Sequence, residues 1–188
     1  MTVKTVSEDI RSIQSQVQKQ PKLKWLVLGS FFSCIAALLQ ATGGLLPGVG
    51  FFISPFATLP ILIGTMILLQ MGVISYFLCI TLLFILFPSE LMVFPFTTGI
   101  LGLGIGVGFH FLKGKLSIIC LGAILLALGI MFLLYILHFP ILGPIASHSF
   151  VTTGCILLFS FLYSWLWVEM APFILKKFKL LLIKNRAR

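Results

Sequence analysis

The sequence predicts an all-α protein, a polytopic membrane bundle of six transmembrane helices with both termini in the cytoplasm. Hydrophobic residues make up 60% of the 188-residue chain and charged residues only 9%, whereas a soluble domain has roughly half and a quarter. The Lys and Arg residues also gather in three short clusters separated by long apolar stretches. A membrane span needs about 20 apolar residues, and the apolar length of the chain accommodates about six spans.

The three basic clusters predict the topology, because the cytoplasmic flanks of membrane helices collect Lys and Arg. The stretches 25–112 and 116–175 contain no basic side chain, so each is expected to leave the cytoplasm and return to it. The net charge of +9 is confined to the ends of spans, which favours the lipid bilayer with its anionic inner leaflet as a partner, and not nucleic acid. The clusters are Lys4, Arg11, Lys19, Lys22 and Lys24; Lys113 and Lys115; and Lys176, Lys177, Lys179, Lys184, Arg186 and Arg188.

Residues 1–24 are predicted to form a cytoplasmic amphipathic segment. Apolar side chains recur there at spacings of four, three and four, which is the period of a helix with one apolar face. Ser7 is a plausible N-cap, and Pro21 is expected to end the helix. The segment is expected to lie on the cytoplasmic membrane surface. The apolar positions are Val6, Ile10, Ile13 and Val17.

Residues 25–170 are expected to form the six-helix membrane domain, in which the stretch 51–87 is ambiguous. Its only central break is Gln70 with Gly72. Because an even number of spans must separate the first two basic clusters, this stretch is expected to cross twice, with a tight inner turn at Gln70-Met71-Gly72. The predicted spans are 25–46, 52–69, 72–87, 91–111, 116–138 and 149–170, and the basic cytoplasmic tail, residues 171–188, is expected to lie on the surface as a helix beyond Pro172.

Small residues recur at every fourth position of the first span, at Gly29, Ser33 and Ala37. Such a strip permits close approach of another helix, either within the same chain or from another membrane subunit. In the fourth span, Gly102/Gly106 and Gly104/Gly108 form two interleaved pairs of small residues. These pairs indicate a flexible or closely packed helix.

Polar groups within the spans are few, and such groups are functional candidates. Gln40 could face a pocket or lie at the interface, and Glu90 could be a solvated acid at a helix start or a carboxylate that binds a ligand. His138 and His148 flank an outer loop without a third metal ligand, so no metal site is predicted. No catalytic constellation and no cofactor site can be argued, so the chain is not expected to be an enzyme. The outer polar and aromatic groups suit binding of a small organic substrate.

The layout of the chain resembles a known family. Six short spans, the small-residue strip and the loop Leu46-Pro47-Gly48-Val49-Gly50, followed by Pro60-Ile-Leu-Ile-Gly64 and Gly99-Ile-Leu-Gly102, are similar to the substrate-binding S component of energy-coupling factor (ECF) vitamin transporters. The resemblance covers about residues 25–170. It implies that Gly29, Ser33 and Ala37 dock a transmembrane coupling subunit, which is itself bound to two ATPase subunits. It also implies that the loop after the first span covers a substrate pocket near the outer face.

The sequence thus leads to a functional hypothesis with one alternative. The hypothesis is a substrate-capture subunit for uptake of a vitamin or cofactor precursor, in the plasma membrane of a bacterial cell. The alternative is a small, non-transporting membrane assembly or regulatory protein that acts by helix packing. The candidate substrate-binding residues are Gln40, Phe51, Phe52, Ser54, Glu90, Thr97, Thr98, His138, His148 and Thr152.

Overall fold

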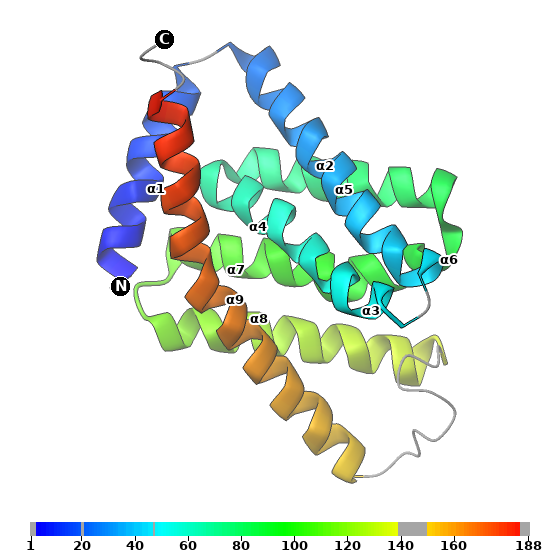
Figure 1. Ribbon diagram of the computed structural model, residues 1–188. Helices are drawn as coiled ribbons and strands as arrows, with labels where there is room; N and C mark the ends of the chain where they lie inside the picture. Colours follow the sequence, from blue (N-terminus) through cyan, green and yellow to red (C-terminus); the bar gives the residue numbers. More distant parts are fainter. Residues whose placement is uncertain (1–2, 20, 47, 139–149, 185–188) are drawn as a thin grey trace.

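The computed structural model describes residues 3–19, 21–46, 48–138 and 150–184, and these residues form a bundle of helices without a strand (Figure 1). Among these described residues, six helices are long and apolar enough to cross a membrane, which confirms the predicted all-α bundle of six membrane-length helices; the cytoplasmic placement of both termini stays a prediction. The six helices are Lys22–Leu45, Gly50–Ile67, Leu69–Leu86, Pro88–Phe111, Lys115–Ile136 and Phe150–Lys179.

Several spans are assembled from shorter elements. The second contains a 3₁₀ turn, η1, and the fourth and fifth contain the π-helical turns η2 and η3. The elements are α1 (Val3–Gln18), α2 (Lys22–Leu45), α3 (Gly50–Ile53), η1 (Ser54–Ala57), α4 (Thr58–Ile67), α5 (Leu69–Leu86), α6 (Pro88–Leu91), η2 (Pro95–Gly99), α7 (Ile100–Phe111), α8 (Lys115–Met131), η3 (Phe132–Ile136) and α9 (Phe150–Lys184).

The ambiguous stretch forms two helices that are each long and apolar enough to cross a membrane, as predicted, but the turn between them lies earlier than predicted. The chain leaves the helical conformation at Leu68, which is extended with φ −146° and ψ 125°, and α5 begins at the next residue. Gly72 is not part of the turn. It packs against α4, where an added Cβ would lie 2.5 Å from the Cα of Thr65. The glycine is needed because the two helices of this hairpin approach closely, and not because the chain reverses there.

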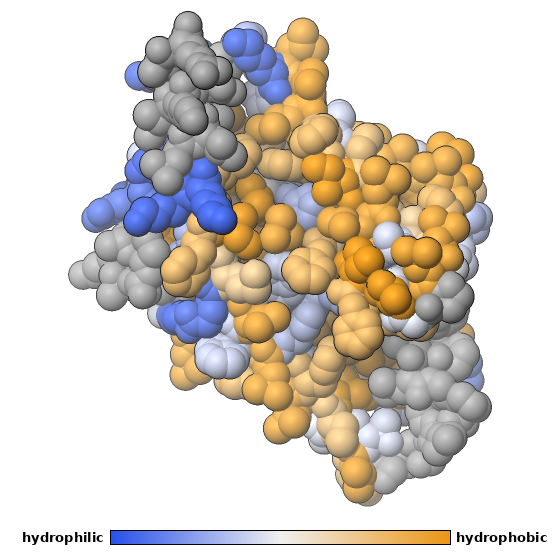
Figure 2. Space-filling view, in the orientation of Figure 1, coloured by the Kyte–Doolittle hydropathy of each residue, from blue (hydrophilic) through white to orange (hydrophobic). Residues whose placement is uncertain are grey.

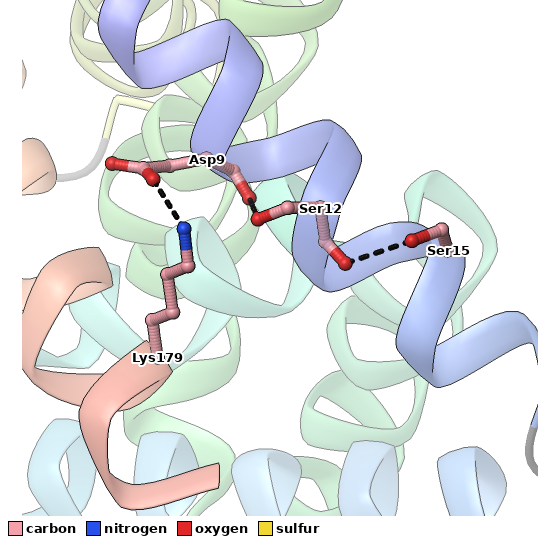
Figure 3. Close-up of polar contacts among 4 residues, drawn as sticks. All are labelled: Asp9, Ser12, Ser15 and Lys179. Carbon is pink, nitrogen blue, oxygen red and sulfur yellow. Dashed lines mark hydrogen bonds and ion pairs between the residues drawn. The ribbon is translucent and has the colours of Figure 1, made fainter. Parts of the chain in front are cut away.

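Helix α1 is amphipathic as predicted, but its apolar face packs on the bundle and not on lipid. Val6, Ile10 and Ile13 are each no more than 2% exposed and belong to the same core cluster as residues of α9. The Asp9 carboxylate accepts a hydrogen bond from the Lys179 ammonium at 2.6 Å, which ties α1 to α9 (Figure 3). Ser7 is not the N-cap, because the helix begins at Val3.

Helix α9 continues through Pro172 to Lys184. The prediction that the tail forms a separate surface helix beyond Pro172 is therefore wrong. Proline removes one backbone hydrogen bond from a helix interior. Membrane helices tolerate this loss because neighbouring helices and side chains compensate. Trp167, Ala171 and Leu175, on either side of the proline, are at most 2% exposed. Their burial against the other helices holds the segment in the bundle.

The described residues of the three basic clusters gather at one end of the bundle, which we call the basic end. It comprises α1, the start of α2 with Lys22 and Lys24, the turn between α7 and α8 with Lys113 and Lys115, and the C-terminal part of α9 (Figure 1). An ion pair between Lys115 and Glu169 joins the start of α8 to α9 at this end. Figure 2 shows hydrophilic residues on this side and at the start of α2, with hydrophobic residues over most of the rest of the face. That the basic end faces the cytoplasm stays a prediction.

The small-residue strip of α2 is covered by α5. Gly29, Ser33 and Ala37 are buried. The Ser33 hydroxyl lies 2.9 Å from the Gly29 carbonyl and 3.1 Å from the Ser75 carbonyl, and the Ser75 hydroxyl donates to the Gly29 carbonyl at 2.9 Å. The chain's own helix thus fills this surface, and the prediction that a coupling subunit docks on the protein stays a prediction that the strip does not support.

Replacing Ser33 by Leu is expected to destabilise the protein by about 2 kcal/mol or more, because a larger side chain must enter a fully packed interface and two hydrogen-bonded groups lose a partner. Thermal unfolding of the purified protein in detergent measures the change. Cys34→Leu is the matched control, since Cys34, the next residue after Ser33, is exposed and is expected to face lipid. Equal melting temperatures for the two variants would show that the strip is not an intramolecular interface.

The four glycines of the two interleaved pairs lie on two faces of α7, and both faces are packed. This confirms the packing interpretation and extends it, because each pair contacts a different neighbour. The pair Gly102/Gly106 faces α4: an added Cβ would lie 2.8 Å from the Thr58 carbonyl oxygen at Gly102 and 2.5 Å from Thr65 Cβ at Gly106. The pair Gly104/Gly108 faces α8: an added Cβ would lie 2.2 Å from Leu125 Cδ1 at Gly104 and 3.0 Å from Ile118 Cγ2 at Gly108.

Candidate functional site

Three of the predicted site residues meet in one hydrogen-bonded chain at the end of the bundle opposite the basic end. Gln40 lies in α2, Glu90 in α6 and Thr98 in η2. The Gln40 amide nitrogen donates to Oε2 of Glu90 at 2.8 Å, and the Thr98 hydroxyl donates to Oε1 of Gln40 at 2.8 Å. Gln40 is 1% exposed, so it is a buried linker between helices and not an interfacial residue.

The direction of this chain follows from the chemistry of its members. An ionised carboxylate only accepts hydrogen bonds, so the amide group of Gln40 must turn its nitrogen toward Glu90. Its oxygen then faces Thr98, whose hydroxyl donates. Glu90 also lies in the first turn of α6, where the partial positive charge of a helix start favours a carboxylate. The carboxylate of α6 is thus held by the Gln40 amide of α2, which is distant in sequence.

Two glycines that the sequence analysis did not single out complete the site. An added Cβ at Gly43 or at Gly44 would lie 3.2 Å from Oε1 of Glu90. The missing side chains leave room for the carboxylate beside the C-terminal turn of α2. Among the described residues, no hydrogen bond reaches this second oxygen. The sequence signal for these two residues was the Gly43-Gly44 dipeptide shortly after Gln40, because paired glycines mark an unusual backbone conformation or a close approach of another group.

The turn that carries Thr98 is itself unusual, because η2 is a π-helical turn, and such turns are frequent at functional sites. Its neighbours hold it in place. The Tyr76 hydroxyl donates to the Pro95 carbonyl at 3.1 Å, and the rings of Phe96 and Phe132 stack with their centroids 4.7 Å apart. Thr97 is buried and donates to the Val93 carbonyl at 2.7 Å, so it supports this turn and does not face the carboxylate.

The residues of the predicted covering loop divide into two groups. Ser54 lies beside the site, because its Cβ is 3.4 Å from the position of an added Cβ on Gly43. Phe51 and Phe52 are 69% and 80% exposed. Their part in covering a substrate pocket stays a prediction.

His138 is not part of this chain of hydrogen bonds, and Thr152 lies on a different helix from its three members. His138 is exposed, has a φ of 52° and lies with Nδ1 3.2 Å from the Ile136 carbonyl. Thr152 lies in the first turn of α9, which begins at Phe150. His148 lies outside the described residues. Within the described part of the chain, no three His, Cys, Asp or Glu side chains come together as metal ligands would.

The site can therefore accept hydrogen bonds or bind a positive charge through one positioned carboxylate, whose second oxygen receives no hydrogen bond from the described residues. A carboxylate within a membrane span is costly unless it is paired, and such groups commonly mark a pathway or a ligand site. The Gln40 amide fixes the orientation of the carboxylate, and the Thr98 hydroxyl fixes the orientation of that amide.

Fold and site together define the class, which is a polytopic membrane protein with six helices and a polar cluster at the end away from its basic residues. No family model matches the chain, and neither a curated protein nor a solved structure is significantly similar to it.

Proposed function

We propose that the protein is a membrane-embedded substrate-capture subunit that binds a small organic molecule at Gln40, Glu90 and Thr98. One observation carries this proposal. A buried amide from α2 holds one oxygen of a half-buried carboxylate and leaves the other beside two glycines. An ionisable group arranged in this way within a span is a functional candidate by default. The proposed role is capture without chemical turnover.

The chemistry of the site suggests the ligand class. Oε1 of Glu90 would accept from an amine, amide or hydroxyl donor, with the strongest interaction for a cationic group. Most of the surrounding helix surface is apolar, since exposed residues near this end include Leu45, Leu86 and Met92. A largely apolar or aromatic molecule with one donor group, as in several vitamins and cofactor precursors, would suit both features.

The proposal includes uptake from outside, with the basic end in the cytoplasm and the site near the outer face of the plasma membrane. As the resemblance to ECF transporters implies, we expect a coupling subunit and ATPase subunits to supply the energy. Because α5 covers Gly29, Ser33 and Ala37, that docking would use a surface other than this strip. The lipid-facing sides of the spans remain available for it.

The alternative, a non-transporting assembly or regulatory protein, is favoured by a different observation. Both polar atoms of the Gln40 side chain are engaged within the chain, and the strip of small residues in α2 packs against the chain's own α5. In that case the cluster of Gln40, Glu90 and Thr98 would only lock the helices together, and no small molecule would bind there.

Retention of small molecules by the purified protein tests the proposal. Protein reconstituted in nanodiscs is denatured, and the released molecules are identified by mass spectrometry. Glu90→Gln keeps the size of the side chain but removes its charge, and we expect it to weaken binding of the retained molecule at least about tenfold, since hydrogen bonds to charged groups contribute about 1.5–3 kcal/mol. Glu169→Gln, the same change at the basic end, is the matched control and is expected to bind like the wild type.

The possible results separate the two functions. A retained molecule whose binding is weakened by Glu90→Gln and not by Glu169→Gln supports substrate capture. A wild-type protein that retains no small molecule, and that binds none at micromolar concentration in a metabolite screen, would exclude it. A loss of thermal stability in Glu90→Gln without any ligand would then support the assembly protein.

A further inference from the structure

A groove of about 560 Å³ lies at the basic end, between the first turns of α2 and α5. It is lined by Lys22, Trp25, Leu69, Gln70, Val73 and Ile74. We propose that this groove binds one anionic phospholipid, with the phosphate at Lys22 and Gln70 and an acyl chain along α5. The proposal concerns the end of the bundle away from Glu90 and is independent of the function proposed for that site.

The polar part of the groove suits a phosphate. Lys22 and Gln70 are both exposed. The ammonium of Lys22 and the amide of Gln70 are hydrogen-bond donors, which phosphate oxygens require. The N-terminal end of α5 adds a favourable partial charge, since its N-cap Leu68 offers no side-chain hydrogen bond to the first turn.

No acidic side chain opposes an anion in the groove. The chain has only four acidic residues, and none of them lines it. Asp9 and Glu169 are paired with Lys179 and Lys115 elsewhere at the basic end. The local charge is therefore positive, which complements an anionic head group.

The apolar part of the groove identifies a lipid and not a soluble phosphate compound. Val73 and Ile74 lie one turn beyond Gln70 along α5, which runs from the basic end into the bundle. Val73 is 41% exposed. Trp25, half-buried, lies on the α2 side at the level where amphipathic rings prefer the membrane interface. The groove is thus polar at Lys22 and Gln70 and apolar at Val73 and Ile74. A phospholipid has the same order, with its head group at the polar end and its acyl chain over the apolar residues.

Native mass spectrometry of the protein from nanodiscs tests this lipid site. The discs contain phosphatidylcholine alone or with one-fifth phosphatidylglycerol, and the lipids that stay bound after release are counted. We expect the wild type to retain one phosphatidylglycerol in preference to phosphatidylcholine. Lys22→Gln should reduce that retention about fivefold, because a basic residue near the surface contributes about 1 kcal/mol toward an anionic lipid. Lys113→Gln removes the same charge at an exposed position of the basic end outside the groove and should leave retention unchanged.

A second variant tests the acyl-chain part of the groove. Val73→Trp places a large ring in the groove from an exposed position, so the fold should tolerate it, and it should abolish the retained lipid. Equal retention by Lys22→Gln and Lys113→Gln, or equal retention of both lipid types by the wild type, would overturn the proposal. Unchanged retention in Val73→Trp would place any bound lipid elsewhere and would overturn it too.

Discussion

Replacing Gly129 by Ala is expected to prevent the native packing of the bundle. An ideal Cβ at this position would lie 1.6 Å from the carbonyl oxygen of Phe96 and 2.7 Å from its carbonyl carbon. These are backbone atoms of η2, so no side-chain rotation can relieve the overlap. Separation of α8 from η2 would also disturb the stacked rings of Phe96 and Phe132. We expect a loss of at least about 3 kcal/mol, at the upper end of the cost of overpacking.

Folding yield and melting temperature in detergent measure this effect. Gly154→Ala is the matched control, because an added Cβ there has nothing within 4 Å and the residue lies in a helix. Alanine at that position should be neutral or stabilising by up to about 1 kcal/mol, from helix propensity alone. A Gly129→Ala protein that melts like Gly154→Ala would mean that α8 and η2 are not in the close contact described above.

The number of spans was predictable because charge and hydropathy constrain it strongly. Parity of the basic clusters predicted two spans in residues 51–87, although no strong break divides them, and the structure has two helices of sufficient length there. The errors concern features that depend on tertiary contacts. Pro172 remains inside α9 because Ala171 and Leu175 beside it are buried. The face of α1 that was expected to contact lipid is covered by α4, α7 and α9. An amphipathic pattern shows that a helix has an apolar face, and not what covers that face.

The site was predictable in its members but not in its connections. Gln40 and Glu90 were candidates because polar groups within spans are few, yet they are separated by 50 positions in the sequence, and no local pattern pairs them. The strip of Gly29, Ser33 and Ala37 illustrates the same problem. Small residues at this spacing permit close packing equally with a helix of the same chain or of a partner, so only the arrangement of α2 and α5 decides between them.

Replacing Gln40 by Leu is expected to be the most damaging change of a single side chain in the polar cluster. It removes the donor to Glu90 and the acceptor for the Thr98 hydroxyl together. Each buried polar group that is left unpaired costs about 1–3 kcal/mol, so a total loss of about 2–5 kcal/mol is expected in thermal unfolding. Thr42→Val is the control on the same helix, because among the described residues the Thr42 hydroxyl donates to the Leu39 carbonyl, one turn earlier in α2, and not to another helix. It should cost less than about 1 kcal/mol.

A double-mutant cycle of Gln40→Leu with Glu90→Gln shows whether the amide acts through the carboxylate. If Gln40 holds Glu90 in place, the two changes will not add, and an interaction energy of about 1 kcal/mol or more is expected for residues in direct contact. Additive effects would contradict the hydrogen bond on which the proposed site depends. Ligand retention by the same variants completes the test, because a site organised by Gln40 loses binding in both single variants, whereas a purely structural lock changes stability alone.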